Sequence, residues 1–385
     1  MKFTIGSNEL KNVLKDISGA LRAKESIESF RLVKITCKGN ELCFAAQNST
    51  YSIERRITYS ESGGVGFWDE GEALVQGDML RQFSALLPAS TCSIETVGEK
   101  AVLRSGGSRV TLLCWQGESK PFRESMKDGR KVTLPTEVLV QALKAVKYAR
   151  AGAQEARDWM KGILLSSHAA GVSFFTAMDG FRLAMRKVFC ATENDFCATL
   201  PTEVCESILA IASSKQEGDA TFMFTDTGVT YQCANVTINS GLIAGTWPDV
   251  KALFPSPNKI QIECRVPRKA LLDAAERANI LSAGKGFIRL EVRQSGVWVQ
   301  SHSEMGESLE EVGGAISLSH AAESTETLMI IGLNPRYLRE VLSAMDAEEV
   351  QMNMTGENSP IIVYPVNGTE ERHLLLPVRI VSKGI

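Results

Sequence analysis

Apolar residues along this chain follow two periods, and together these periods describe one unit that occurs three times. In each copy a short alternating strand leads through a polar break into a helix whose apolar residues recur every three or four positions. The copies begin about 130 residues apart, which is near the usual size of one domain. The strands are expected at 1–5, 131–134 and 260–264, and the apolar helix positions are Leu10, Val13, Leu14, Ile17 and Leu21, then Val138, Leu139, Ala142, Leu143 and Val146, then Leu271, Leu272, Ala275 and Ile280.

A second helix is predicted about halfway through each copy, at 77–87, 202–214 and 335–346. The third of these has clear start signals, because the Asn334 side chain can cap free N–H groups and Pro335 suits the first helical position. Thr202, directly after Pro201, is a comparable start. Each copy is therefore an α+β domain with two helices on one face of antiparallel sheet. The strands are expected at 31–37, 41–46, 101–104, 108–114, 171–176, 221–225, 287–292, 297–301, 350–354 and 361–364.

The length of 385 residues predicts two or three domains, and the repeat favours three. Short polar linkers at 124–130 and 255–259 divide the chain into domains at 1–127, 128–256 and 257–385. Duplication of one domain explains the repeat as well as a ring-shaped assembly does, so the repeat alone leaves both alternatives open.

Composition narrows the class of protein. Hydrophobic residues make up 44% and charged residues 23%, the balance of a globular protein. The formal net charge is −3, so any DNA contact needs a local arrangement of Lys and Arg. The nine cysteines include no CxxC pair, which predicts free buried thiols in a reducing compartment. The start lacks the apolar core of a signal peptide, and no apolar run approaches the ~18 residues that span a bilayer, so a cytoplasmic location is expected.

Few residues are arranged for catalysis or metal binding. None of the four histidines, at positions 168, 302, 320 and 373, has a second histidine or a cysteine at metal-ligand spacing, and we expect neither a metal nor a cofactor. Strand–helix boundaries carry no GxxxxGK or GxGxxG motif, and no GxSxG elbow is present. A hairpin loop explains the glycines at 63–66 better than a phosphate cradle does. Asp179 and Arg182 are the one candidate catalytic pair, although Asp179-Gly180 is an ordinary turn signal.

The first helices of the three copies are richer in bases than in acids, and the second helices reverse this balance. The pattern is compatible with a surface that contacts DNA phosphates loosely and does not recognise the nucleotide sequence, but an ordinary solvated helix face would look similar. The bases of the first helices are Lys11, Lys15, Arg22, Lys144, Lys147, Arg150, Arg268, Lys269 and Arg277, against Glu9, Asp16, Glu137, Asp273 and Glu276.

Six segments, in order over nearly the whole chain, resemble the bacterial DNA polymerase III beta subunit family, the DNA sliding clamps. They are MKFTI at 1–5, LRSGGSR at 103–109, MDGFRLA at 178–184, TWPDV at 246–250 with the Phe-Pro that follows, NPRYL at 334–338 and LLLPVRI at 374–380. The last is the most telling, because the family typically closes on a hydrophobic-Pro-hydrophobic-Arg segment. The resemblance implies the DNA clamp fold and a ring-shaped head-to-tail dimer, whose helices line a hole for duplex DNA. It also implies a non-catalytic processivity factor.

The resemblance further implies partners and sites. A clamp loader opens the ring, and the replicative polymerase and other replication and repair proteins dock by a short peptide between the second and third domains. The pocket would be formed by Met160, Gly180, Phe181, Arg182, Leu183, Pro248, Ala252, Leu253, Asn334, Tyr337, Pro360, Leu374, Leu375, Leu376, Pro377, Val378 and Arg379, with Asp179-Gly180 as a turn that presents Phe181 and Leu183. The family's DNA-touching loops fall here on Lys24, Gln154, Arg157 and Trp159. Together with the basic residues Lys11, Lys15, Lys144, Lys147, Arg150 and Arg277 of the first helices, they are the expected DNA-facing residues. Val110 and Leu112 of one chain would meet Ile280 and Leu281 of the other.

Some residues depart from the family pattern. Phe181 stands where histidine is common, Met178 where threonine is frequent and Ala252 where a basic residue is usual, which leaves the peptide preference open. Residues 381–385 extend past the usual end and are expected to form a tail near the pocket. Two rival functions remain: a three-domain scaffold that binds peptides without encircling DNA, and an enzyme built on Asp179 and Arg182. Dimerisation and retention on circular DNA test the first, and a turnover assay tests the second.

Overall fold

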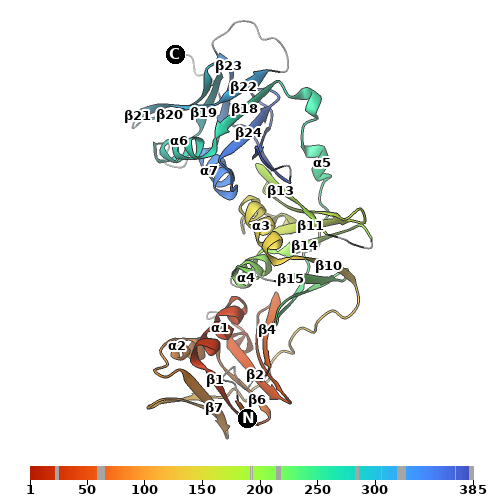
Figure 1. Cartoon of the computed structure of the whole chain (residues 1–385), viewed down its shortest axis with the longest axis vertical. Helices are drawn as coiled ribbons and strands as arrows, with labels where there is room; N and C mark the ends of the chain where they lie inside the picture. The colour runs from red at the N-terminus through yellow and green to blue at the C-terminus, as the bar shows by residue number, and fades with distance from the viewer. Residues whose placement is uncertain are drawn as a thin grey trace. The chain divides into compact units, whose positions relative to one another are not determined.

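The strands predicted from the alternation of apolar residues pair into antiparallel sheets in the computed structural model (Figure 1). The structure describes residues 1–21, 26–58, 66–190, 192, 194–213, 218–281, 286–304, 306–318, 327–368 and 370–380. The chain divides into two units, each described by itself below. Unit 1 comprises 1–140, 190–194 and 200–242, and unit 2 comprises 141–189, 195–199 and 243–385.

Unit 1 joins the first predicted domain to much of the second through a shared sheet. This sheet is continuous because β4 pairs with β17, so that Ile53 lies opposite Ile238. Its order is β10 (Arg130–Pro135), β15 (Asp219–Phe224), β16 (Gly228–Cys233), β17 (Val236–Gly241), β4 (Tyr51–Thr58), β3 (Glu41–Gln47), β2 (Leu32–Lys38) and β6 (Gly71–Gln76). Another sheet has the order β5 (Gly66–Asp69), β1 (Lys2–Gly6), β7 (Thr91–Val97), β8 (Lys100–Ser105) and β9 (Ser108–Leu113). The helices are α1 (Ser7–Ile17), α2 (Gly77–Ala85) and α4 (Thr202–Ala212), and α3 (Thr136–Val146) runs into unit 2.

Unit 2 repeats this plan. Its shared sheet is continuous because β13 pairs with β26, so that Arg182 lies opposite Leu375. The order is β14 (Phe196–Pro201), β11 (Gly162–His168), β12 (Val172–Met178), β13 (Arg182–Phe189), β26 (Glu371–Leu375), β25 (Ile361–Pro365), β24 (Glu349–Met354), β18 (Ile262–Pro267) and β22 (Ala315–Leu318). A further sheet has the order β21 (Gly306–Gly313), β20 (Gly296–Ser303), β19 (Ile288–Arg293) and β23 (Thr327–Leu333). The helices are α5 (Val250–Leu253), α6 (Arg268–Leu281) and α7 (Pro335–Ala344).

The apolar stripes of the helices face the sheets, as the period predicts. In α1 the stripe is fully buried from Leu10 to Ile17. α6 and α7 lie side by side (Figure 1). They share one core in which Leu271 and Val341 have no exposed surface. Burial of these stripes explains why the helices form where they do, since packing of an apolar face supplies most helix stability in proteins.

Every predicted strand and helix is present, with small shifts at the ends. The first helix begins earlier than expected, at Ser7, and tightens after Ile17 into a 3₁₀ turn, η1 (Ser18–Ala20), so that Leu21 lies beyond it. The short helix α5 was not predicted, because a helix of 4 residues is too short to show a helical period of apolar positions. The predictions for Lys24, His320, the glycines at 63–65 and the tail at 381–385 fall outside the described residues.

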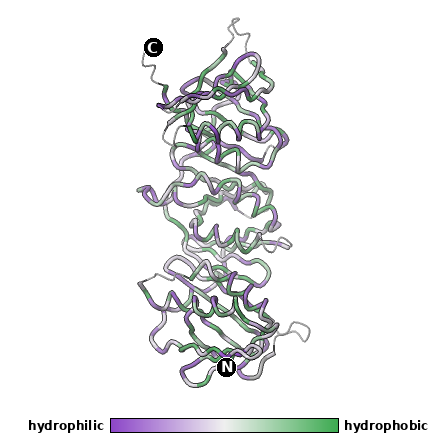
Figure 2. The backbone as a smooth tube through the Cα atoms, turned by 90° about the vertical axis from the view of Figure 1, so that its left-hand side faces the viewer, coloured by the Kyte–Doolittle hydropathy of each residue, from purple (hydrophilic) through white to green (hydrophobic). Residues whose placement is uncertain are grey.

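The nine cysteines are free, as predicted, and six are buried. Cys43 and Cys114 are half-buried, and Cys197 is exposed, which the sequence did not predict. In the described part of the chain, no helix is long and apolar enough to cross a membrane. Figure 2 shows hydrophobic and hydrophilic residues interleaved along that part of the backbone.

Candidate functional site

The turn between β12 and β13 carries the residues that stand at the centre of the predicted pocket. One carboxylate oxygen of Asp179, Oδ1, accepts hydrogen bonds from the backbone N–H groups of Phe181 at 2.9 Å and Arg182 at 3.0 Å. Gly180 has a φ of +89°, which favours glycine because it lacks a Cβ. The turn therefore presents Phe181, which is 59% exposed. Leu183 was expected to be presented with it, but Leu183 lies within β13, where its side chain is buried, whereas Phe181 lies in the turn before the strand.

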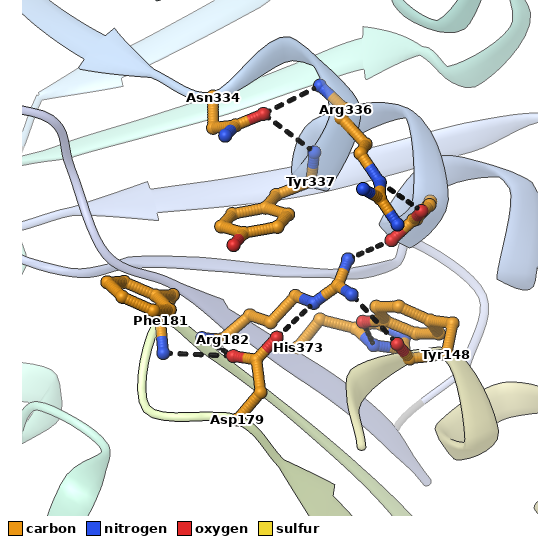
Figure 3. Close-up of polar contacts among 9 residues, drawn as sticks. Tyr148, Asp179, Phe181, Arg182, Asn334, Arg336, Tyr337 and His373 are labelled. Carbon is orange, nitrogen blue, oxygen red and sulfur yellow. Dashed lines mark hydrogen bonds and ion pairs between the residues drawn. The ribbon is translucent and has the colours of Figure 1, made fainter. Parts of the chain in front are cut away.

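Each of the three guanidinium nitrogens of Arg182 has a hydrogen-bond or ion-pair partner (Figure 3). Its Nε donates to Asp179 Oδ2 at 3.0 Å, Nη2 donates to the carbonyl of Tyr148 at 2.9 Å, and Nη1 forms an ion pair with Glu340. The guanidinium lies 4.4 Å from the ring centre of Tyr337, a cation–π distance. The side chain is only 6% exposed, so it braces the site rather than forming an open wall. Asp179 orders the turn and Arg182 is buried among its partners, so the two side chains are not arranged as a catalytic pair.

Glu340 receives a second cation from its own helix. Arg336 Nε donates to it at 2.9 Å across one helical turn. Burial alone would raise the pKa of Glu340, but the hydrogen bonds and charges of Arg182 and Arg336 outweigh burial and hold this pKa below its ordinary value. Asn334 caps the same helix, as predicted: its Oδ1 accepts from the N–H groups of Arg336 and Tyr337, and a proline follows it at the first helical position.

A second polar chain runs beneath this brace. Tyr148 lies in the 3₁₀ turn η3 (Lys147–Ala149), and its hydroxyl is 2.7 Å from Nδ1 of the fully buried His373. The other ring nitrogen, Nε2, is 2.7 Å from Glu371, whose second oxygen pairs with Arg186 at 3.0 Å. Burial raises the pKa of the Tyr148 phenol well above its ordinary value. The hydroxyl therefore keeps its proton, and it can donate a hydrogen bond to His373 Nδ1 in the tautomer whose Nε2–H donates to Glu371.

The segment after β26 closes the site by backbone contacts. The N–H of Leu376 donates to the carbonyl of Phe181 at 2.9 Å, and the N–H of Val378 donates to the carbonyl of Gly332 at 2.8 Å. A Cβ at Gly332 would lie 2.3 Å from the Val378 carbonyl oxygen, so the close approach requires glycine. The apolar side chains left partly open around these contacts are Phe181, Leu376 and Val378, and Leu253 of α5 is exposed as well.

The remaining pocket residues take different places. Buried members are Met160, Leu374 and Leu375. Gly180 lies next to Met160, because a Cβ on it would be 3.8 Å from the Met160 methyl carbon. Tyr337 is half-buried, and its ring lies 6.1 Å from that of Phe181, tilted by 31°. Half-buried positions also include Asn334, Pro360 and Pro377, whereas Pro248, Ala252 and Arg379 are exposed.

The predicted DNA-facing residues differ in whether their side chains form ion pairs and in how far they are exposed. Lys11, Lys15, Lys144 and Lys147 form no ion pair among the described residues. By contrast, Arg157 pairs with Glu155 at 2.8 Å, and Arg277 pairs with Glu310. Arg150 is half-buried and Gln154 is exposed. Trp159 is half-buried, because its ring packs 4.8 Å from that of Trp247. Of these lysines, Lys11 and Lys15 lie on α1, Lys144 lies on α3, and Lys147 lies in the 3₁₀ turn η3 that follows α3.

The predicted interface residues lie at sheet edges and a helix end. β9 is an edge strand of its sheet, where Val110 is half-buried and Leu112 is buried. At the end of α6, Ile280 is 79% exposed and Leu281 is half-buried. β21 is an edge strand of the neighbouring sheet in unit 2 and exposes Leu309.

Comparison with known families accounts for nearly the whole chain. Models of the DNA polymerase III beta subunit match in order: the N-terminal domain at 1–122, the central domain at 133–249 and the C-terminal domain at 251–379. The chain belongs to the DNA polymerase III beta subunit family. It is therefore built from three tandem clamp domains, as the repeat and the resemblance predicted.

Individual relatives support the same assignment. The beta sliding clamp of Bacillus subtilis is 24% identical over 98% of this chain and 100% of that protein. The solved structure of the Bacillus subtilis sliding clamp has a TM-score of 0.90 at 23% identity, over 99% of this chain and 100% of that one. A Pseudomonas aeruginosa sliding clamp bound to griselimycin has a TM-score of 0.89 at 21% identity, covering 99% and 100%. These structures show that the chain has the clamp fold.

Sequence reasoning missed several residues of the candidate site. Glu340, Tyr148, His373 and Glu371 were not predicted, although they hold Arg182 and the strand pair in place. Their partners lie far away in the sequence, so no local spacing marks them. The one available signal was a histidine and a glutamate two residues apart in a strand otherwise rich in leucine.

Proposed function

We propose that this chain is a DNA sliding clamp, a non-catalytic processivity factor that encircles duplex DNA and tethers the replicative polymerase. The observation that carries the proposal is the ordered match to all three beta subunit domains. Clamp-loader proteins, repair polymerases and other replication proteins are its further partners, and the cytoplasm is its location. The domain boundaries fall near 128 and 257, where β10 and β18 soon begin the second and third copies.

Partner peptides bind beside the β12–β13 turn. Support comes from three partly open apolar side chains, Phe181, Leu376 and Val378, on segments that the Arg182 brace and backbone bonds hold together. Leu253 of α5 is a further exposed apolar candidate. Two apolar anchors of a peptide would gain roughly 3–6 kcal/mol by burial there. Ordering of a flexible peptide offsets part of that gain, so affinity near ~1 μM is expected, which suits exchange of partners.

The DNA contacts are made by lysines to phosphates, without recognition of nucleotide bases in a groove. The unpaired Lys11, Lys15, Lys144 and Lys147 are the candidates, because an amine without an acidic partner is free to displace a counterion from phosphate. Binding to open linear duplex is therefore expected to be weak and to weaken further with salt.

The ring is a head-to-tail dimer. Edge strands present unpaired N–H and C=O groups, and β9 and β21 are such edges in the described structure. Exposed Leu309 on β21 and exposed Ile280 on the adjoining helix α6 supply apolar area that a partner subunit would cover.

Retention on circular DNA tests the proposal directly. Loaded protein should stay on a nicked circular plasmid through gel filtration in high salt and should be lost when one cut linearises the plasmid. Ile280→Glu with Leu281→Glu should give folded monomers by light scattering and no retention. The matched control is Leu86→Glu with Val97→Glu, which changes exposed apolar residues outside β9 and α6. A wild-type protein that is monomeric at micromolar concentration, yet binds polymerase peptides, would support the scaffold instead.

A further inference from the structure

The outer face of the shared sheet in unit 2 carries unpaired cations together with aromatic rings. Strand register places these side chains on one face: Phe174 lies opposite Lys187, and Met185, two residues from Lys187, lies opposite Arg372. The intervening positions point the other way, since Phe175 lies opposite Arg186 and is fully buried. We call Phe174, Met185, Lys187, Phe189, Lys251, Tyr364 and Arg372 the cation–aromatic face.

Each cation of this face lies over a ring. Lys187 Nζ is 4.4 Å from the ring centre of Phe189, and Lys251 Nζ is 5.4 Å from that of Phe174. The guanidinium of Arg372 is 5.0 Å from the ring centre of Tyr364. Such contacts orient a cation without neutralising its charge.

The charges of this face lack acidic partners, unlike the cations on the opposite side of the same strands. Within the described residues, Lys187, Lys251 and Arg372 form no ion pair, whereas Arg182 and Arg186 are both paired with buried or half-buried carboxylates. The chain as a whole carries a net charge of −3. A positive patch on an acidic protein attracts an anionic partner and repels further copies of the protein's own acidic surface.

The rings decide which anion fits. Single-stranded nucleic acid binds through bases stacked on open aromatic faces, but here Lys187 and Lys251 already cover ring faces of Phe189 and Phe174. A carboxylate can approach the cations from outside without displacing them. Apolar side chains can meanwhile contact the remaining ring surface, since Phe189 is 62% exposed.

We propose that the cation–aromatic face is a docking surface for an acidic, leucine-containing segment of a partner protein, separate from the peptide site at the β12–β13 turn. Carboxylates of the segment pair with Lys187, Lys251 and Arg372, and its apolar residues cover Phe189 and Met185. The two sites together would allow one partner to hold the clamp at two points, which raises its overall affinity without new contacts at either site.

Fluorescence anisotropy with the full chain tests the proposal. The probe is a labelled peptide of repeating Glu-Leu-Gly; a Lys-Leu-Gly peptide and a thymidine oligonucleotide of equal length are compared with it. The Glu-Leu-Gly peptide should bind and should weaken with salt. Lys187→Glu with Arg372→Glu should reduce its affinity by about tenfold or more, because attraction becomes repulsion. Lys38→Glu with Lys100→Glu, the same change in net charge on exposed lysines of unit 1, should have little effect.

A second variant separates specific docking from simple charge. Phe189→Ala removes an exposed ring, so folding should be unchanged while the affinity for Glu-Leu-Gly falls and that for oligoglutamate does not. Three results would overturn the proposal: no binding of the acidic probe, equal loss in the control charge variant, or tighter binding of the oligonucleotide that Lys187→Glu abolishes. Retention on circular DNA should be normal in all variants, so failure here and failure of the clamp assignment are distinguishable.

Discussion

Two junctions in this molecule are built on the same sheet plan but differ in how their helical side is closed. The first junction, in unit 1, pairs β4 with β17, and there the Tyr51 hydroxyl contacts the Gly19 carbonyl at 2.5 Å and Ser207 Oγ at 2.9 Å. The second junction, in unit 2, pairs β13 with β26 and is braced by Arg182 and Glu340. The contacts that cross the first junction join neutral, small groups, because the buried ion pairs of Arg55 with Glu9 and Asp16 stay within the first copy. Charged, long side chains cross the second junction.

The difference explains why only the second junction is a candidate binding site. A Cβ on Gly19 would lie 2.3 Å from Ser207 Oγ, so this contact of the first junction has no room for another group. The long side chains of Arg182 and Glu340 instead hold their segments together while leaving Phe181, Leu376 and Val378 partly open. Continuous sheet joins the domains in both cases, and side-chain length on the helical side determines whether apolar surface remains for a ligand.

The largest expected effect is removal of the charged brace. Arg182→Met should destabilise the protein by roughly 3–5 kcal/mol, because it leaves partly buried Asp179 and Glu340 without their cation. Arg265→Met is the matched control: its pair with Glu349 is exposed, and such pairs contribute about 0–1 kcal/mol. Urea unfolding of both variants measures the difference, and equal midpoints would contradict the view that the second junction depends on buried charge.

Close packing at the first junction gives the next largest effect. Gly19→Val should cost roughly 1–3 kcal/mol, because its methyl groups meet Ser207 and the Tyr51 hydroxyl in a filled space. Gly107→Val serves as the control, since nothing lies within 4 Å of a Cβ there. Adding Ser207→Gly to Gly19→Val should recover part of the loss. A double variant no more stable than Gly19→Val would show that strain elsewhere, not this contact, limits the junction.

The two junctions also differ in how far the sequence could predict them. The helices and the strands expected from period are present because local burial patterns fix them, as Leu10 to Ile17 in α1 illustrate. The turn at Asp179-Gly180 was likewise readable from local chemistry. The brace was not, because Arg182 meets Tyr148 and Glu340 only after three separate segments have packed together. Leu183 was misjudged for a related reason: a pocket carried over from a resemblance does not say which wall residues are buried.

Lowering the pH should destabilise the second junction but not the neutral contacts that cross the first junction. The folded state lowers the pKa of Glu340 below the ordinary value of 4.5. A lowered carboxyl pKa stabilises the fold above that value, and this contribution is lost as pH falls through the lower, folded-state pKa. Urea midpoints from pH 7 down to pH 3 should therefore fall less steeply in Glu340→Gln than in the wild-type protein. Parallel curves would remove Glu340 as a source of the acid sensitivity. Tyr51→Phe, a neutral change at the first junction, should lower the free energy of unfolding by about 0.5–1.5 kcal/mol equally at every pH.

The smallest change in stability is expected from Phe181, and it separates binding from folding. Phe181→Ala should alter the free energy of unfolding by no more than about 0.5 kcal/mol, because most of the side chain is already exposed. Affinity for a polymerase C-terminal peptide should nevertheless fall about tenfold, or ~1.4 kcal/mol, since the peptide loses an aromatic surface beside Leu376. Leu86→Ala, an exposed apolar residue of unit 1, is the matched control for calorimetry. If both variants bind the peptide as the wild-type protein does, the apolar surface at the β12–β13 turn is not where the peptide lies. A loss confined to Phe181→Ala would place the peptide there, because Leu86 is also exposed but lies in unit 1.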